Sequence, residues 1–271
     1  MTETKELILV KKKGSEFAYF NFGGYEHRNH SMLHLCYKIY KNIDCDFEFF
    51  IHTGDRPIKQ NRTYCFSTER QDYDYVCPDF VFDSWQKIGI KDYETYRKSI
   101  DTLGKQNTPK NNKIIWCGTL NSDSRKILHH KKDSFNFVDV VPINDLHKGH
   151  ELCYNFIPID KQIKEYKYLL DIRACGYSGR LKLLLWSNRI VFLADRPYKE
   201  FFFQFMKPWQ HYVPVREDFS DFEENYNKIE SDPELQKHIL NETKNFRNTY
   251  LTIDRALSYW KYRIMENQNE V

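Results

Sequence analysis

Short apolar segments alternate with stretches of helical periodicity along most of this chain, and the alternation forms two series. In the first series, a strand-like segment at 47–53 follows residues 28–42, whose apolar side chains recur at helical spacing. Five strand-like segments of the second series alternate with helical ones, at 113–117, 137–142, 168–172, 189–193 and 211–215. Such alternation is typical of a parallel sheet with helical crossovers. We therefore predict an α/β protein with two Rossmann-like domains.

A polar, proline-containing stretch at 106–112 (QNTPKNN) separates the two series and has the character of a linker. The length of 271 residues suits two domains of roughly 100–150 residues each. We predict an N-terminal domain over 1–107 and a C-terminal domain over 108–245. The remaining segment, 246–271, is predicted to hold a final helix that packs back on the first domain.

Charge and cysteine content exclude several classes of protein. The 41 basic and 38 acidic residues give a net charge of only +3, which argues against a nucleic-acid partner. The seven cysteines form no Cys-x-x-Cys pair and no cluster with histidines, so we expect neither a zinc site nor a disulfide framework. The sequence also lacks an apolar run of about 18 residues and a secretory leader pattern. We therefore expect a soluble, reduced, cytoplasmic protein with no membrane span.

The block at 166–182 (YKYLLDIRACGYSGRLK) is the most informative part of the chain. A strand ends near Asp171, a turn of small residues follows, and a helix begins near Ser178, Gly179 and Arg180. Backbone N–H groups at the start of a helix and an arginine fork both bind phosphate. The alternative, a plain strand–turn–helix joint with a surface arginine, explains this block equally well by itself.

Two long motifs in this region resemble the CAP10-like glycosyltransferase family, which includes Rumi-type protein O-glucosyltransferases and capsule xylosyltransferases. Residues 166–182 match its "KYL-D/F…G-x-S-x-R-x-K" motif, and KPWQHYVPV at 207–215 matches "PWVHYIPV". Three weaker matches lie in register: FFIHTGDRP at 49–57 with "INVRDYP", WCGT at 116–119 with "FRG(S/A)xT", and the segment at 195–202 with an acidic "E-W/F-F" segment. The chain's compactness also resembles short versions of these enzymes in large DNA viruses.

The resemblance implies a GT-B fold, in which two Rossmann-like domains face each other across a cleft. It further implies inverting transfer from a UDP-sugar, bound by the C-terminal domain, to a hydroxyl of a glycan or glycoprotein. Neither a cofactor nor a metal is required. Asp55 matches the family's catalytic base, and Asp83 and Asp195 are the reserve candidates. The residues expected to bind the donor are Gly118, Thr119, Arg125, Ser178, Gly179, Arg180, Asp195 and Glu200, with Arg180 on the diphosphate.

Several alternatives stay open at this level. The sequence "SGR" at 178–180 follows the capsule xylosyltransferases and favours UDP-xylose, with UDP-glucose as the alternative donor. Trp85 and Tyr177 are acceptor-side candidates for stacking on a sugar ring, although core packing explains them equally well. The triplets at 44–46 and 72–74 spell the metal-binding motif DxD of another glycosyltransferase fold, but we interpret them as chance matches. A glycan-binding protein that keeps the fold without turnover is the rival function.

Overall fold

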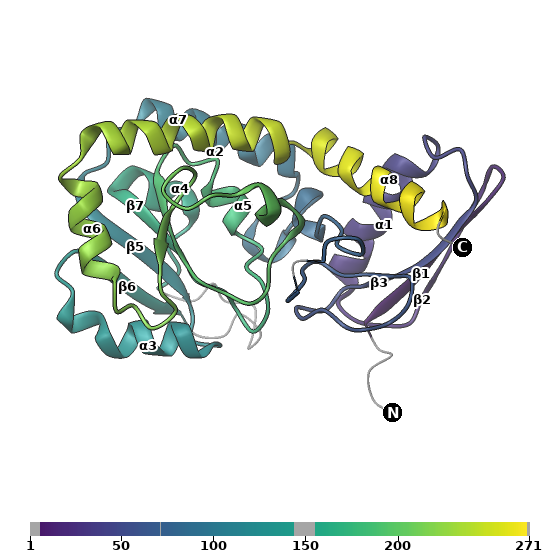
Figure 1. Ribbon diagram of the computed structural model, residues 1–271, viewed down its shortest axis with the longest axis horizontal. Helices are drawn as coiled ribbons and strands as arrows, with labels where there is room; N and C mark the ends of the chain where they lie inside the picture. The colour runs from purple at the N-terminus through teal and green to yellow at the C-terminus, as the bar shows by residue number, and fades with distance from the viewer. Residues whose placement is uncertain (1–5, 71, 144–154, 270–271) are drawn as a thin grey trace. The chain divides into compact units, whose positions relative to one another are not determined.

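The computed structural model describes residues 6–70, 72–143 and 155–269, and these form two compact units. The first unit takes its residues from three segments, 1–96, 197–205 and 249–271. The second unit consists of 97–196 and 206–248. Each unit is therefore discontinuous in sequence, and each contains one sheet (Figure 1).

The sheet of the first unit is mixed, with strand order β2-β1-β3-β4. Its strands are β1 (Leu7–Lys13), β2 (Glu16–Asn21), β3 (Phe47–His52) and β4 (Thr63–Tyr64). β1 pairs antiparallel with both β2 and β3, and only β3 and β4 run parallel. The prediction of a parallel, Rossmann-like sheet is therefore wrong for the first unit. The reason is local: two residues join β1 to β2, and Gly14 turns the chain there with φ of 57°, so the two strands form a hairpin.

Two long helices pack in the first unit, α1 (Glu26–Tyr40) and α8 (Ile253–Asn269). Trp260 of α8 is fully buried, and its ring lies 6.1 Å from that of Phe49 and 6.2 Å from that of Tyr64. Three short 3-10 helices complete the unit, η1 (Phe80–Phe82), η2 (Gln86–Ile88) and η4 (Phe201–Phe205). The C-terminal helix therefore covers the aromatic core behind β3 and β4.

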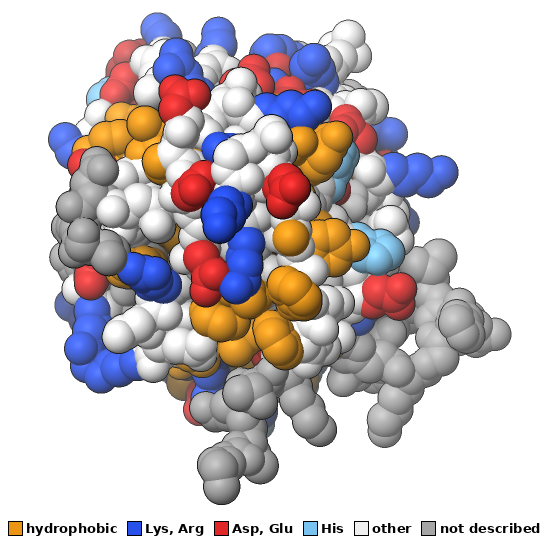
Figure 2. Space-filling model, turned by 90° about the vertical axis from the view of Figure 1, so that its right-hand side faces the viewer, with side chains coloured by type: hydrophobic (Ala, Val, Ile, Leu, Met, Phe, Trp, Pro, Cys, Tyr) orange, Lys and Arg blue, Asp and Glu red, His pale blue; other side chains and the backbone are white. Residues whose placement is uncertain are grey.

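The outer strand β2 is largely exposed, and it carries aromatic side chains. Tyr19 and Phe20 are more than half exposed, as is Phe22 directly after the strand. Elsewhere on the surface, basic and acidic side chains are interspersed with small hydrophobic groups on the face shown in Figure 2. This mixture agrees with the near-zero net charge of the sequence.

The sheet of the second unit is entirely parallel, so the prediction from the second series is confirmed. Its strands are β5 (Asn111–Thr119), β6 (Val138–Ile143), β7 (Tyr166–Asp171), β8 (Ile190–Ala194) and β9 (Val213–Val215). Leu128 of α3 (Asp123–Lys131) and Ile239 of α7 (Pro233–Tyr250) lie in the same buried core cluster on this sheet, and Arg247 of α7 pairs with Asp101 of α2 (Tyr93–Gln106) at 2.6 Å. The remaining helices are η3 (Lys132–Ser134), α4 (Ile159–Glu165), α5 (Leu181–Leu184) and α6 (Phe222–Glu230).

The strand order of this sheet, β6-β5-β7-β8-β9, determines where a ligand can bind. From β5 the chain first proceeds to β6 at one edge, and then returns to add β7, β8 and β9 on the other side of β5. The direction of winding thus reverses between β5 and β7. In open α/β sheets, ligands bind outside the carboxyl ends of the strands at such a reversal. None of the helices in the described part of the chain is long and apolar enough to span a membrane.

Candidate functional site

Three arginines lie across the carboxyl ends of β5, β7 and β8, at the point where the sheet reverses direction. Each guanidinium donates to backbone carbonyls near these strand ends. Arg125 bonds to the carbonyls of Thr119 (3.0 Å) and Ile172 (2.9 Å). Arg196 bonds to those of Ala194 (3.1 Å) and Asp171 (2.9 Å). These bonds hold the side chains of Arg125 and Arg196 at the strand ends.

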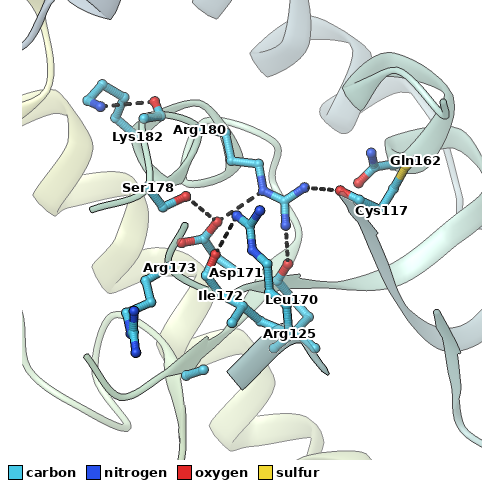
Figure 3. Close-up of polar contacts among 12 residues, drawn as sticks. Cys117, Arg125, Gln162, Leu170, Asp171, Ile172, Arg173, Ser178, Arg180 and Lys182 are labelled. Carbon is cyan, nitrogen blue, oxygen red and sulfur yellow. Dashed lines mark hydrogen bonds and ion pairs between the residues drawn. The ribbon is translucent and has the colours of Figure 1, made fainter. Parts of the chain in front are cut away.

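Asp171, the last residue of β7, is the centre of this cluster (Figure 3). Its carboxylate is fully buried and accepts hydrogen bonds from Ser178 (2.8 Å), Arg180 (3.0 Å) and Arg196 (2.8 Å). Burial alone would raise the pKa of Asp171, but Arg196 and Arg180 outweigh it and hold the pKa below its usual value. The carboxylate is therefore ionised, and it orients the side chains around it.

Arg180, the predicted diphosphate ligand, is largely engaged with the protein. Its Nε donates to Asp171, and its two terminal nitrogens donate to the carbonyls of Leu170 (3.1 Å) and Cys117. Three of the five N–H groups of a guanidinium are thus used. Its side chain remains 15% exposed. Arg180 therefore links β5 to β7, and its positive charge faces the reversal point.

Arg125 is the least compensated cation of the cluster. Burial, together with the charges of Arg180 and Arg196, lowers its pKa to about 9. Its Nε is buried and has no hydrogen-bond partner among the described residues. Arg180 and Arg196 pair with Asp171, and the charges of both guanidiniums act on the buried Arg125. Three guanidiniums gathered in this way favour the binding of an anion such as a phosphate.

The other predicted donor residues of the second unit surround this cluster. Gly118 and Thr119 end β5, and a Cβ atom at Gly118 would lie 3.0 Å from the Trp116 ring. The backbone carbonyl of Gly179 accepts a hydrogen bond from the Lys182 ammonium (2.9 Å). Asp195 follows β8 and is exposed. Its carboxylate accepts a hydrogen bond from the backbone N–H of Arg196 (2.8 Å).

Tyr177 does not present a ring face to solvent in the structure. It is only 4% exposed, and the Lys182 ammonium lies 5.8 Å from its ring centroid. Its environment agrees with core packing, the alternative considered for this residue. The acceptor-side role of Tyr177 therefore has no support in this geometry.

Sequence reasoning did not assign a role to Asp171 or Arg196, although they form the best-connected ion pair of the site. A signal for Arg196 was present: the tripeptide Asp-Arg-Pro follows a strand twice, at 55–57 after β3 and at 195–197 after β8. For Asp171, position at the end of a buried strand was the only indication. A charged residue there is costly unless it is paired.

The remaining predicted residues belong to the first unit. Asp55, the proposed base, forms an ion pair with Arg28 (2.9 Å) and is 38% exposed. Trp85 is half-buried, and its ring meets that of Phe80 edge-on at 5.8 Å. Glu200 is buried at the start of η4, only 2% exposed.

A hollow of about 540 Å³ begins at Pro57, two residues after Asp55. Its walls combine apolar side chains with basic, acidic, amide and hydroxyl groups, from the segments 57–63, 65–70 and 72–76. A hollow of this size is within the range of small-molecule sites. It offers hydrogen-bonding groups of every kind close to Asp55 in the sequence.

The reserve acids and the DxD triplets have structural contacts. Asp83 pairs with His34 (2.6 Å). In the triplets, Asp46 accepts the Gly14 N–H (2.7 Å) and Asp74 pairs with Arg263 (3.0 Å). Within the described ranges, no three His, Cys, Asp or Glu side chains are grouped so that they could hold a metal ion.

Comparison with known proteins identifies the family. The family model of glycosyl transferase family 90 matches residues 27–268. Protein O-glucosyltransferase 2 of Danio rerio is 27% identical over an alignment of 240 residues, and the match covers 79% of this chain and 46% of that protein. Protein O-glucosyltransferase 1 of Rattus norvegicus is 32% identical over 102 residues, and the match covers 38% of this chain and 26% of that protein. O-glucosyltransferase rumi of Drosophila pseudoobscura pseudoobscura is 31% identical over 99 residues, and the match covers 36% of this chain and 24% of that protein.

The matched part thus covers less than half the length of each of these relatives. The family model, by contrast, spans most of this chain and contains both long motifs as well as the arginine cluster. The resemblance noted in the sequence is therefore confirmed at the level of the family. The chain belongs to glycosyl transferase family 90.

Proposed function

We propose that this protein is an inverting glycosyltransferase that moves a sugar from a UDP-sugar to a hydroxyl of a glycan or glycoprotein. The observation that carries the proposal is the cluster of Arg125, Arg180 and Arg196 at the reversal point of the parallel sheet. A diphosphate is an anion of the kind that guanidiniums bind. In this sheet class, the reversal point is also the expected place for a nucleotide.

The proposed chemistry needs two groups. The acceptor oxygen attacks C1 of the sugar, its proton passes to a base, and the bond from C1 to the diphosphate oxygen breaks. We assign Asp55 as the base and the Arg125–Arg180–Arg196 cluster as the group that stabilises the departing UDP. Because guanidiniums supply the positive charge, we propose that the reaction needs no metal and no cofactor. The assignment of Asp55 rests on the motif it shares with the family.

The GT-B architecture and the identity of the donor are further parts of the proposal. The parallel sheet of the second unit supports a Rossmann-like donor domain, whereas the mixed sheet of the first departs from that pattern. Two donors have support: the "SGR" sequence at 178–180 favours UDP-xylose, and the similarity to protein O-glucosyltransferases favours UDP-glucose.

A donor panel tests the proposal directly. The protein is incubated with UDP-xylose, UDP-glucose and other UDP-sugars, and UDP release is followed with and without a chelator. We expect release from one of the two named donors at a rate that the chelator does not change. Release that requires added Mn²⁺ would contradict the metal-free mechanism. UDP binding without any turnover would instead support the glycan-binding alternative.

A further inference from the structure

Two consecutive residues of α1 hold the turn that carries Asp55. The Arg28 guanidinium donates to the carbonyl of Thr53 through Nη1 (2.8 Å). The hydroxyl of the same Thr53 donates to the side-chain carbonyl of Asn29 (3.0 Å). Thr53 and Asn29 are both buried, so the start of the turn is fixed to α1 on two sides.

The Arg28 guanidinium is itself held in place by aromatic rings. It lies 4.4 Å from the ring centroid of Tyr25 and 5.0 Å from that of Phe80. Its side chain is only 14% exposed. A planar guanidinium held by two rings has few orientations available, which preorganises its hydrogen bonds.

From this position Arg28 also reaches Asp55. Its Nη2 lies 2.9 Å from Oδ1 of the carboxylate, while the Asp55 side chain remains 38% exposed. One guanidinium therefore fixes both the backbone before the turn and the carboxylate on it. The carboxylate is held in one orientation and is still accessible from solution.

Gly54, the residue before Asp55, lies close to two side chains. A Cβ atom on Gly54 would lie 2.3 Å from Oε2 of Glu6 and 2.5 Å from Cε1 of His52, so a larger residue would displace them. Arg28 is therefore the contact that holds the Asp55 carboxylate itself.

We infer that Arg28 is a positioning residue for the base: it orients the Asp55 carboxylate to accept the proton of the acceptor hydroxyl. The inference rests on the proposed function, in which Asp55 is the base. Arg28 acts through Asp55 and takes no proton in the reaction. Misplacement of a reacting group by about 1 Å can cost a factor of about 100 in rate.

The test uses the full chain with the donor identified by the panel, and it compares R28Q, R28K and D55N with the double variant R28Q/D55N. We expect R28Q to lower kcat about 100-fold with an unchanged Kd for UDP. R28K should recover part of this loss, because an ammonium can bind either Thr53 or Asp55 but does not span both. The control is K41Q, since Lys41 also lies over two rings, those of Tyr37 (5.6 Å) and Tyr40 (5.8 Å). We expect K41Q to transfer at the wild-type rate.

The double variant separates positioning from a general structural role. If Arg28 acts through Asp55, R28Q/D55N is no slower than D55N alone. Three results would overturn the inference while the proposed function stands. They are a double variant whose loss of transfer rate is the sum of the two single losses, a wild-type transfer rate for R28Q, and a loss of UDP affinity in R28Q that parallels its loss of rate. A wild-type protein that transfers from no donor would refute the proposed function, and this inference with it.

Discussion

Arg196 binds Asp171 through two of its nitrogens: Nη1 lies 2.8 Å from the carboxylate and Nη2 lies 2.9 Å from the backbone carbonyl of the same residue. Both side chains are almost completely buried. The pair therefore joins the ends of β7 and β8 and forms the base of the arginine cluster. Its integrity determines the shape of the proposed donor site.

Removing the charge of Asp171 should destabilise the protein strongly. In D171N, Arg196 and Arg180 lose their shared counter-ion, and breaking a buried ion pair costs about 3–5 kcal/mol. The measurement is the unfolding free energy in urea at pH 7. A matched control is D123N, because Asp123 forms an exposed ion pair with Lys126 (3.5 Å) and should cost at most about 1 kcal/mol. Equal losses for the two variants would contradict the buried-pair interpretation.

Arg125 should contribute to the affinity for UDP. R125Q removes one of the three guanidiniums, and a charge-assisted hydrogen bond is worth about 1.5–3 kcal/mol, or about 10–100-fold in Kd. Calorimetric titration with UDP and with uridine checks this. We expect R125Q to weaken UDP binding and to leave uridine binding nearly unchanged. An equal effect on both ligands would show that Arg125 does not act on the diphosphate.

Asp55 should be required for transfer and dispensable for donor binding. D55N keeps the size of the side chain and removes its basicity, and loss of a general base typically costs about 10²–10⁴-fold in rate. Transfer rate and UDP affinity are measured on the same preparation. D83N is the comparison, because Asp83 is a reserve candidate with its own partner, His34. If D83N loses transfer and D55N does not, the role of base belongs to Asp83.

Stability should fall in mild acid because of His211. Burial, with Lys207 and His238 nearby, lowers the pKa of His211 despite the opposing effect of Glu242. Its Nδ1 also accepts the backbone N–H of Lys207 (3.0 Å). The unfolded chain takes up a proton near pH 6.5, whereas the folded protein does so only at lower pH. The titration of His211 therefore leaves the free energy of unfolding unchanged above about pH 6.5, and it lowers that free energy as the pH falls below about 6.5.

The measurement is the difference in melting temperature between the wild type and H211N from pH 7.5 to 5.5. Asparagine can accept the same N–H but does not titrate. The wild type should therefore lose stability faster than H211N on acidification. Parallel curves would exclude His211 as the cause.

A side chain at Gly104 should be poorly tolerated. Gly104 lies in α2, and a Cβ atom there would meet the carbonyl oxygen of Ser187 at 1.9 Å. Alanine favours helices by about 1 kcal/mol over glycine, but this contact forces α2 away from its neighbour at a cost of about 1–3 kcal/mol. We expect G104A to be less stable in urea unfolding. T102A, at an exposed position of the same helix, should be at least as stable as the wild type.

The sequence predicted one sheet correctly and the other incorrectly, for identifiable reasons. In the second unit, connections of 18 to 22 residues that contain helices separate the strands, and parallel pairing needs crossovers of this kind. In the first unit, the alternation of strand-like and helical segments led to the prediction of a parallel sheet. Only two residues at Gly14 separate the first two strands, however, and so short a connection permits only a hairpin. The local turn therefore decided the strand direction there.

The candidate site shows a similar division. The position of the site followed from the strand end at Asp171 and from the glycine turn after it. Arg125 and Arg180 followed from the family resemblance. Arg196 did not, because the three arginines are brought together only by the order of the strands. The same holds for Arg28 and Asp55, which are 27 residues apart in sequence and are joined by the packing of α1 against the turn. Contacts of this kind have no local signature.

The discontinuous units have a practical consequence for dissecting the protein. The chain passes from one unit to the other within α2, between residues 96 and 97, and within α7, between residues 248 and 249. Truncation at residue 107 would remove α8, and with it Trp260, which covers Phe49 and Tyr64. We therefore expect such a fragment to aggregate on expression. A soluble first unit would require α8 to be restored, for instance by a linker that rejoins residues 249–269 to the fragment.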